Sequence, residues 1–312
     1  MERKPFSGVM TAIVSPFRPD SSLDTHAFLK ILRMQKNAGI DGVVVAGTTG
    51  ESPTLSLAEK ISLLELALGE QSENFSIYIG TGTNSTEATL KEVRELSGFR
   101  AQGRGVDGVM SVVPYYNKPN QAGLRLHFSS IARSFPSVSF CLYNVPGRTA
   151  CHLAPETFAT LAQEFQNIVA IKEAAGDVLA MTRLRAQLSQ AGVNRNIEIL
   201  SGDDATFPAA LVTGAKGVIS VTSHIIPRTL VAILRAAQEG DLERVRALNT
   251  AAFPLSQGLF CAPNPVPVKY ALSLHDFCTP TVRSPLAPLS EPEMRIVAQS
   301  LKEAELKGAQ IL

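Results

Sequence analysis

The sequence predicts an α/β fold, a closed (β/α)8 TIM barrel with a C-terminal helical extension. Eight short apolar runs recur along the chain, and segments with helical spacing separate them. The runs are nearly continuous in apolar residues, which is typical of parallel strands buried on both faces. No G-x-G-x-x-G sequence follows the first run, and this disfavours the alternative fold, a doubly wound open sheet.

The first elements follow from these patterns. The eight strands are expected at residues 9–14, 42–46, 75–79, 108–113, 139–143, 168–171, 197–200 and 217–221. The first helix is expected to begin near Asp24 and to stop at Gly39. The second should begin at Ser56, where Glu59 three residues later matches a capping box.

Apolar spacing predicts which faces of two helices are buried. In the second helix, one face should carry Leu57, Ile61, Leu64 and Leu68. In the helix that follows Gly176, it should carry Leu179, Leu184 and Leu188.

The end of the chain predicts a division into two parts. A helix after Pro227 would complete the eighth strand–helix unit, so a catalytic barrel is expected over residues 1–240. A helical extension is expected over residues 241–312, with helices near residues 241–248, 268–272 and 291–306.

Composition excludes several classes of partner. The 312 residues are 45% hydrophobic, carry a net charge of +1 and contain no basic block, so neither nucleic acid nor an anionic membrane is expected as a partner. No apolar stretch approaches the roughly 20 residues that span a bilayer, and residues 1–6 lack the apolar region of a secretory signal. A cytoplasmic location is therefore expected.

Cysteine and histidine spacing predicts neither a disulfide framework nor a metal site. The four cysteines show no CxxC spacing and are expected to be free thiols. None of the five histidines lies at zinc-ligand spacing from another ligand. No metal or cofactor is expected, and a metal-dependent aldolase is disfavoured.

Lys172 is the candidate nucleophile, because it follows the apolar run 168–171 at the end of a predicted strand. Active sites of such barrels lie at the C-terminal ends of the strands. Burial there disfavours the charged ammonium form, and a neutral amine can attack a ketone and form a Schiff base. Other lysines are less suited: Lys216 precedes a strand, Lys118 lies in a polar loop, and Lys269 belongs to the extension.

Other strand ends carry candidate binding groups. Glycines flank Thr48 and Thr49, so backbone N–H groups there could bind an anion, although a plain strand-to-helix turn is equally compatible. Arg148 could hold a carboxylate through two hydrogen bonds, or lie on the surface. Tyr143 could transfer protons, or be a core tyrosine with a satisfied hydroxyl.

Five segments, at residues 47–52, 143–149, 171–174, 201–204 and 217–221, together resemble the dihydrodipicolinate synthase family. This family belongs to the superfamily that also contains the N-acetylneuraminate lyases. The resemblance extends from about Gly8 to Lys269. It implies a lyase of lysine and diaminopimelate biosynthesis that condenses pyruvate with L-aspartate-4-semialdehyde through a Schiff base.

The resemblance also implies roles for individual residues. Lys172 would form the Schiff base, and Tyr143 would donate and accept protons. Thr48 would connect Tyr143 to Tyr116 of a neighbouring subunit, within a homotetramer built as a dimer of dimers. The pyruvate carboxylate would bind Thr48 and Thr49, and the semialdehyde carboxylate would bind Arg148. Gly202 and the carbonyl of Ile219 would line the site.

Two alternatives remain open. A class I aldolase acting on a keto-sugar acid or N-acetylneuraminate would share the fold and the lysine, and Arg148 argues against it. A non-catalytic barrel is disfavoured by the presence of Lys172, Tyr143, Thr48 and Tyr116 together.

The resemblance also bears on feedback by lysine. The positions that match the lysine pocket of inhibited relatives are Leu57, Lys60 and Ala88. A cation and a missing carboxylate would bind an ammonium group poorly, so feedback should be weak or absent. Strong inhibition by millimolar lysine would contradict this expectation.

Overall fold

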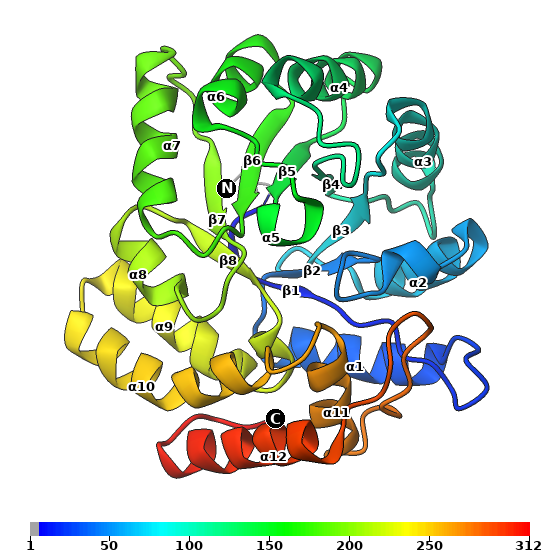
Figure 1. Cartoon of the computed structure of the whole chain (residues 1–312), viewed down its shortest axis with the longest axis vertical. Helices are drawn as coiled ribbons and strands as arrows, with labels where there is room; N and C mark the ends of the chain where they lie inside the picture. Colours follow the sequence, from blue (N-terminus) through cyan, green and yellow to red (C-terminus); the bar gives the residue numbers. More distant parts are fainter. Residues whose placement is uncertain (1–5) are drawn as a thin grey trace. The chain divides into compact units, whose positions relative to one another are not determined.

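The computed structural model describes residues 6–312, and its strands follow one another in chain order around a closed barrel (Figure 1). The pair β1–β2 and the successive pairs from β3–β4 to β7–β8 are parallel. The (β/α)8 fold is confirmed. The strands are β1 (Gly8–Ala12), β2 (Gly42–Val45), β3 (Ser76–Thr81), β4 (Gly108–Val112), β5 (Phe140–Asn144), β6 (Ile168–Glu173), β7 (Glu198–Ser201) and β8 (Gly217–Ser220).

Helices separate the strands and continue beyond the last one. The first eight are α1 (Thr25–Asn37), α2 (Leu57–Glu70), α3 (Thr86–Gly98), α4 (Gln121–Ser134), α5 (Pro146–Thr149), α6 (Pro155–Glu164), α7 (Leu179–Gln190) and α8 (Phe207–Val212). The last four are α9 (Pro227–Glu239), α10 (Leu242–Gly258), α11 (Val266–Ser273) and α12 (Glu291–Leu306). Across residues 6–312, every helix is too short or too polar to span a lipid bilayer.

The chain divides into two compact units. Unit 1 comprises residues 6–7 and Tyr78–Ile219, and therefore carries β4 to β7 and the helices α3 to α8. Unit 2 comprises Gly8–Ile77 and Ser220–Leu312, with β1, β2, α1, α2 and the helices α9 to α12. The expected division into a catalytic barrel over residues 1–240 and a helical extension over residues 241–312 stays a prediction.

Helix ends agree with the capping signals. The side chain of Asp24 accepts a hydrogen bond from the N–H of Ala27 at the start of α1. Gly39 follows that helix with a φ of 83°, a backbone conformation that glycine adopts without strain. Ser56 and Glu59 form both hydrogen bonds of a capping box at the start of α2.

The prediction of the buried helix faces is confirmed for the later leucines and wrong for the first residue of each helix. In α2 the buried stripe is Lys60, Leu63, Leu64, Ala67 and Leu68. Leu57 is 40% exposed because it lies in the first turn, and Ile61 is half-buried at the edge of the stripe. In α7, Leu184 and Leu188 are buried with Ala180 and Met181, whereas Leu179 is exposed. Both exposed leucines are the first residues of their helices.

Candidate active site

The register of β5 and β6 brings Lys172 and Tyr143 together in unit 1. Their Cα atoms are direct partners across the two strands. Side chains of such partners point to the same side of a sheet. The Nζ atom of Lys172 lies 4.4 Å from the centroid of the Tyr143 ring, and both side chains are buried. Strand pairing thus places an amine against a phenol at the C-terminal end of the barrel.

Lys172 is 5% exposed, and within residues 6–312 it forms no ion pair with a carboxylate. Its chain neighbour Glu173 points to the opposite face, because side chains alternate along a strand. An amine that is not held in an ion pair is free to approach a carbonyl carbon. The site therefore suits an amine that acts as a nucleophile.

Gly202, after β7, leaves the space that the Lys172 side chain occupies. A Cβ atom built on Gly202 would lie 2.9 Å from Cε of Lys172 and 2.5 Å from Cβ of Ala174. The Gly202 N–H donates to the carbonyl of Glu173 over 2.7 Å. The residue therefore has to be a glycine, since its backbone approaches β6 closely. Ile219 is buried on β8 of the same unit.

Arg148 lies on α5, the single helical turn that begins directly after β5. Its side chain is exposed at the C-terminal end of the strands. The buried Thr149 closes this turn, since its hydroxyl donates to the carbonyl of Cys151 over 2.9 Å. The turn thus presents a guanidinium on the edge where Tyr143 and Lys172 end their strands.

Tyr116 occupies a strained turn after β4. Its φ is 72°, and the N–H of Asn117 donates to the carbonyl of Tyr115 over 2.9 Å. A three-residue turn with a positive φ at its centre is rare and costs free energy for a bulky side chain. The amide of Asn117 also donates to the carbonyl of Asn84. The turn holds the Tyr116 ring 87% exposed, directed away from the core of its own chain.

In unit 2, Thr48 and Thr49 lie in the turn after β2. Thr49 is buried and Thr48 is half-buried. The residues with positive φ are Ala46 and Glu51, at 52° and 54°, and not the glycines of the turn. Gly50 is needed for close packing, because its Cβ would lie 3.1 Å from Cα of Ala46. The role of this turn in anion binding stays a prediction.

Sequence reasoning missed a buried ion pair that holds this turn. Lys269 of α11 is fully buried and pairs with Glu51. Its ammonium also donates to the carbonyl of Thr281 over 3.0 Å and lies 4.1 Å from the Phe17 ring centroid. Burial lowers the pKa of Lys269, and the Glu51 carboxylate opposes this change. A single lysine within the apolar segment 266–272 was the only local signal.

The backbone N–H of Arg283 and the side chain of Asn264 also join the turn to the C-terminal part of unit 2. The Arg283 N–H donates to the other carboxylate oxygen of Glu51 over 2.9 Å. The Arg283 guanidinium binds Glu59 and lowers the pKa of that carboxyl to about 2. The amide of Asn264 donates to the hydroxyl of Thr49 over 2.9 Å. The C-terminal part of unit 2 therefore fixes the position of the Thr48–Thr49 turn.

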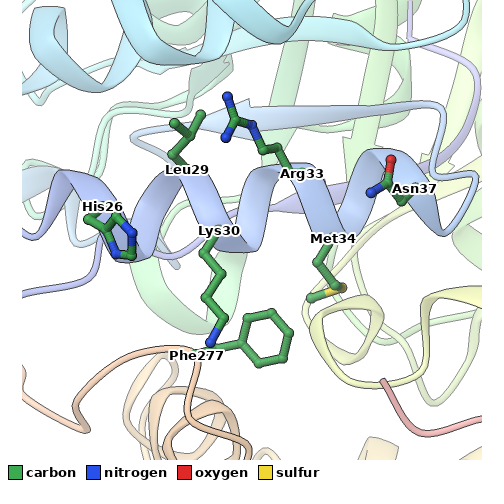
Figure 2. A pocket seen from close by; sticks show the side chains of 7 residues that line it. All are labelled: His26, Leu29, Lys30, Arg33, Met34, Asn37 and Phe277. Atoms are coloured by element: carbon green, nitrogen blue, oxygen red, sulfur yellow. The ribbon is translucent and has the colours of Figure 1, made fainter.

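A separate cavity of about 480 Å³ lies between α1 and Phe277 in unit 2 (Figure 2). The lysine and the arginine that line it already have partners within the chain. Lys30 donates to the carbonyl of Asp276 over 2.7 Å, and Arg33 pairs with Glu70 at 2.7 Å. None of the residues predicted for the active site lines this cavity. The candidate active site is therefore the group around Lys172.

Comparison with known proteins agrees with the motifs. The profile of the Dihydrodipicolinate synthetase family matches residues 5–304. The chain is 40% identical over 298 residues to the 4-hydroxy-tetrahydrodipicolinate synthase of Bacillus subtilis (strain 168), covering 96% of this chain and 99% of that protein. Its identity to the synthase of Chlorobium limicola is 37% over 306 residues, covering 98% and 100%.

Solved structures show the same relationship. The dihydrodipicolinate synthase of Thermotoga maritima superposes with a TM-score of 0.91 at 38% identity, over 97% of this chain and 99% of that one. The 4-hydroxy-tetrahydrodipicolinate synthase of Methylacidiphilum fumariolicum SolV gives a TM-score of 0.89 at 40% identity, over 97% of each chain. The profile, the sequence identity and the shared fold all lead to one conclusion: this chain belongs to the dihydrodipicolinate synthetase family.

Proposed function

We propose that this chain is a lyase that condenses pyruvate with L-aspartate-4-semialdehyde through a Schiff base, as a step of lysine and diaminopimelate biosynthesis. The observation that carries the proposal is Lys172, buried at the end of β6 against Tyr143 and without a carboxylate partner in residues 6–312. The names of the relatives support the choice of reaction.

The chemistry follows from the amine. The neutral Nζ of Lys172 attacks the C2 carbonyl of pyruvate, and loss of water leaves an iminium. The iminium accepts electrons as the methyl carbon loses a proton, so an enamine forms without a metal. The enamine carbon then attacks the aldehyde carbon of the second substrate. Tyr143 is the group that donates and accepts protons during imine formation and release.

The remaining assignments extend the proposal to binding. Thr48 and Thr49 hold the pyruvate carboxylate, and Gly202 and Ile219 line the site beside Lys172. Thr48 connects Tyr143 to Tyr116, which a neighbouring subunit supplies. We therefore propose a homo-oligomer, a tetramer made of two dimers. By contrast, one similar structure is that of a monomeric dihydrodipicolinate synthase variant.

Arg148 provides the test of the second substrate. Removing a group that pairs with a substrate carboxylate typically costs several kcal/mol. Replacing Arg148 with Ala should therefore raise KM for aspartate-4-semialdehyde by about a hundredfold or more. KM for pyruvate should change little, because a different group binds that carboxylate. Steady-state assays that vary each substrate in turn measure both values.

The same assay separates this reaction from the alternative. The wild-type protein should turn over the semialdehyde and leave N-acetylneuraminate and keto-sugar acids unchanged. Faster cleavage of a keto-sugar acid than condensation of the semialdehyde would replace the proposal with the class I aldolase.

A further inference from the structure

We infer that Asn144 is a positioning residue for the proposed reaction, because its carboxamide joins the end of β6, beside Lys172, to the turn that carries Arg148. The inference rests on the proposed function. Asn144 is the last residue of β5, directly after Tyr143, and it is fully buried. It faces away from the catalytic side of the strand, since side chains alternate.

The first connection runs from β5 to β6. The Cα atoms of Asn144 and Glu173 are partners across the strands, and Nδ2 of Asn144 donates to Glu173 over 2.8 Å. The second oxygen of Glu173 accepts the N–H of Ala175 over 2.9 Å. Glu173 is 3% exposed, and its hydrogen bond with Asn144 is buried. The two hydrogen bonds of Glu173 fix the backbone at the residue that follows Lys172.

The second connection closes the Arg148 turn. Oδ1 of Asn144 accepts the N–H of Leu153 over 2.9 Å. The segment between these two residues contains α5 and Arg148, so the bond joins the two ends of that segment. Nδ2 also lies 3.1 Å from Nδ1 of His152. The position of Arg148 therefore depends on the same carboxamide as the end of β6.

Only a carboxamide satisfies both connections. An aspartate could accept from Leu153, but it would place a second carboxylate against Glu173. A leucine would leave the Glu173 carboxylate and the Leu153 N–H without their partner. Losing a hydrogen bond to a buried charged group is among the more costly single changes in a folded protein. Burial raises the pKa of Glu173, and the hydrogen bond from Asn144 opposes that change.

The geometry permits an exchange of the two functional groups as a test. Asn144→Asp alone sets two carboxylates against each other, and Glu173→Gln alone sets two amide groups against each other. In the double variant, the new glutamine can donate to the new aspartate, whose second oxygen still accepts from Leu153. The pair then keeps one negative charge and the hydrogen bonds between its two members, to Ala175 and to Leu153, while Nδ1 of His152 faces an oxygen in place of Nδ2.

Each single variant should raise KM for the semialdehyde and lower kcat/KM by about tenfold or more. The double variant should recover most of that loss. All rates are normalised to the fraction of protein that borohydride traps with pyruvate, so that misfolded protein does not count. If Asn144→Asp alone does not fold, the Glu173→Gln variant and the double variant still decide the outcome.

Asn167→Asp is the matched control. Asn167 precedes β6 at its other end, and its amide donates to the carbonyls of Ala132 and Phe135 at 3.0 and 2.9 Å. This change should lower thermal stability and leave KM for the semialdehyde unaltered. The inference is overturned if the control raises KM as much as Asn144→Asp, or if the double variant is no better than the worse single one. A wild-type protein that fails to trap pyruvate would instead overturn the proposed function.

Discussion

At the residue scale, the Lys172 side chain has room because residue 202 is a glycine. The lysine occupies space that a Cβ on Gly202 would enter, at 2.9 Å from its Cε. The same Cβ would lie 2.5 Å from Cβ of Ala174, which cannot rotate away. A side chain at position 202 would therefore displace Lys172 from its place 4.4 Å from the centroid of the Tyr143 ring.

Gly202→Ala should lower kcat/KM by about a hundredfold, since a displacement of about 1 Å of a reacting group has an effect of this size. Stopped-flow or quenched measurements of imine formation with pyruvate report the change directly. Gly98→Ala is the control, because a Cβ at that helix end meets no atom within 4 Å. Imine formation at the wild-type rate in Gly202→Ala would show that the lysine does not depend on this space.

Several of these residues could be predicted from sequence, for a physical reason. Lys172 and Tyr143 follow or end apolar runs, and barrel geometry assigns strand ends to one edge. Gly202 was assigned to the site only through the resemblance to the dihydrodipicolinate synthase family. The partners on the opposite face could not be predicted. The pairing of β5 with β6 brings Asn144 and Glu173 together. Residue spacing along the chain does not indicate which side chains meet across two strands.

At the element scale, the C-terminal helices stabilise the turn that carries Thr48 and Thr49. Lys269 and Glu51 are 218 positions apart in the chain, and both side chains are buried. Local patterns predicted α11 as a helix but gave no indication of this pair. The strands were predicted more closely than helix faces, because a continuous apolar run defines a buried strand whereas Leu57 and Leu179 lie in first turns.

Lys269→Met should destabilise the fold by about 3–5 kcal/mol, because it leaves the Glu51 carboxylate buried without its cation. The double variant with Glu51→Gln should be less destabilised, since the unpaired charge is gone. Urea unfolding followed by circular dichroism compares the two. Lys302→Met, which removes an exposed lysine of α12, should cost little. Equal destabilisation of the single and double variants would mean that charge is not the cause.

At the scale of the whole molecule, the exposure of Tyr116 supports the proposal that a second copy of the chain completes the site. The three-residue turn at Tyr116 has a positive φ, which costs free energy, and it leaves the tyrosine 87% exposed. Backbone strain of this kind persists where function requires it. The sequence predicted the position of Tyr116 after a strand, but its exposure and strained turn are visible only in the structure.

Tyr116→Phe should lower kcat by about a hundredfold, the typical contribution of a positioned proton donor. Mixed oligomers with Lys172→Ala should regain activity, because the lysine-deficient subunit supplies an intact Tyr116 to its partner. Each variant refolded alone is the control. No gain on co-refolding the two would show that Tyr116 does not act across subunits.

The central claim is that Lys172 forms an imine with pyruvate, and borohydride trapping tests it most directly. The protein is incubated with pyruvate, reduced and digested, and the modified peptide is identified by mass spectrometry, with Lys172→Arg as the control. The account predicts one adduct, on Lys172, and none on the buried but ion-paired Lys269. An unmodified protein, or an adduct on another lysine, would contradict it.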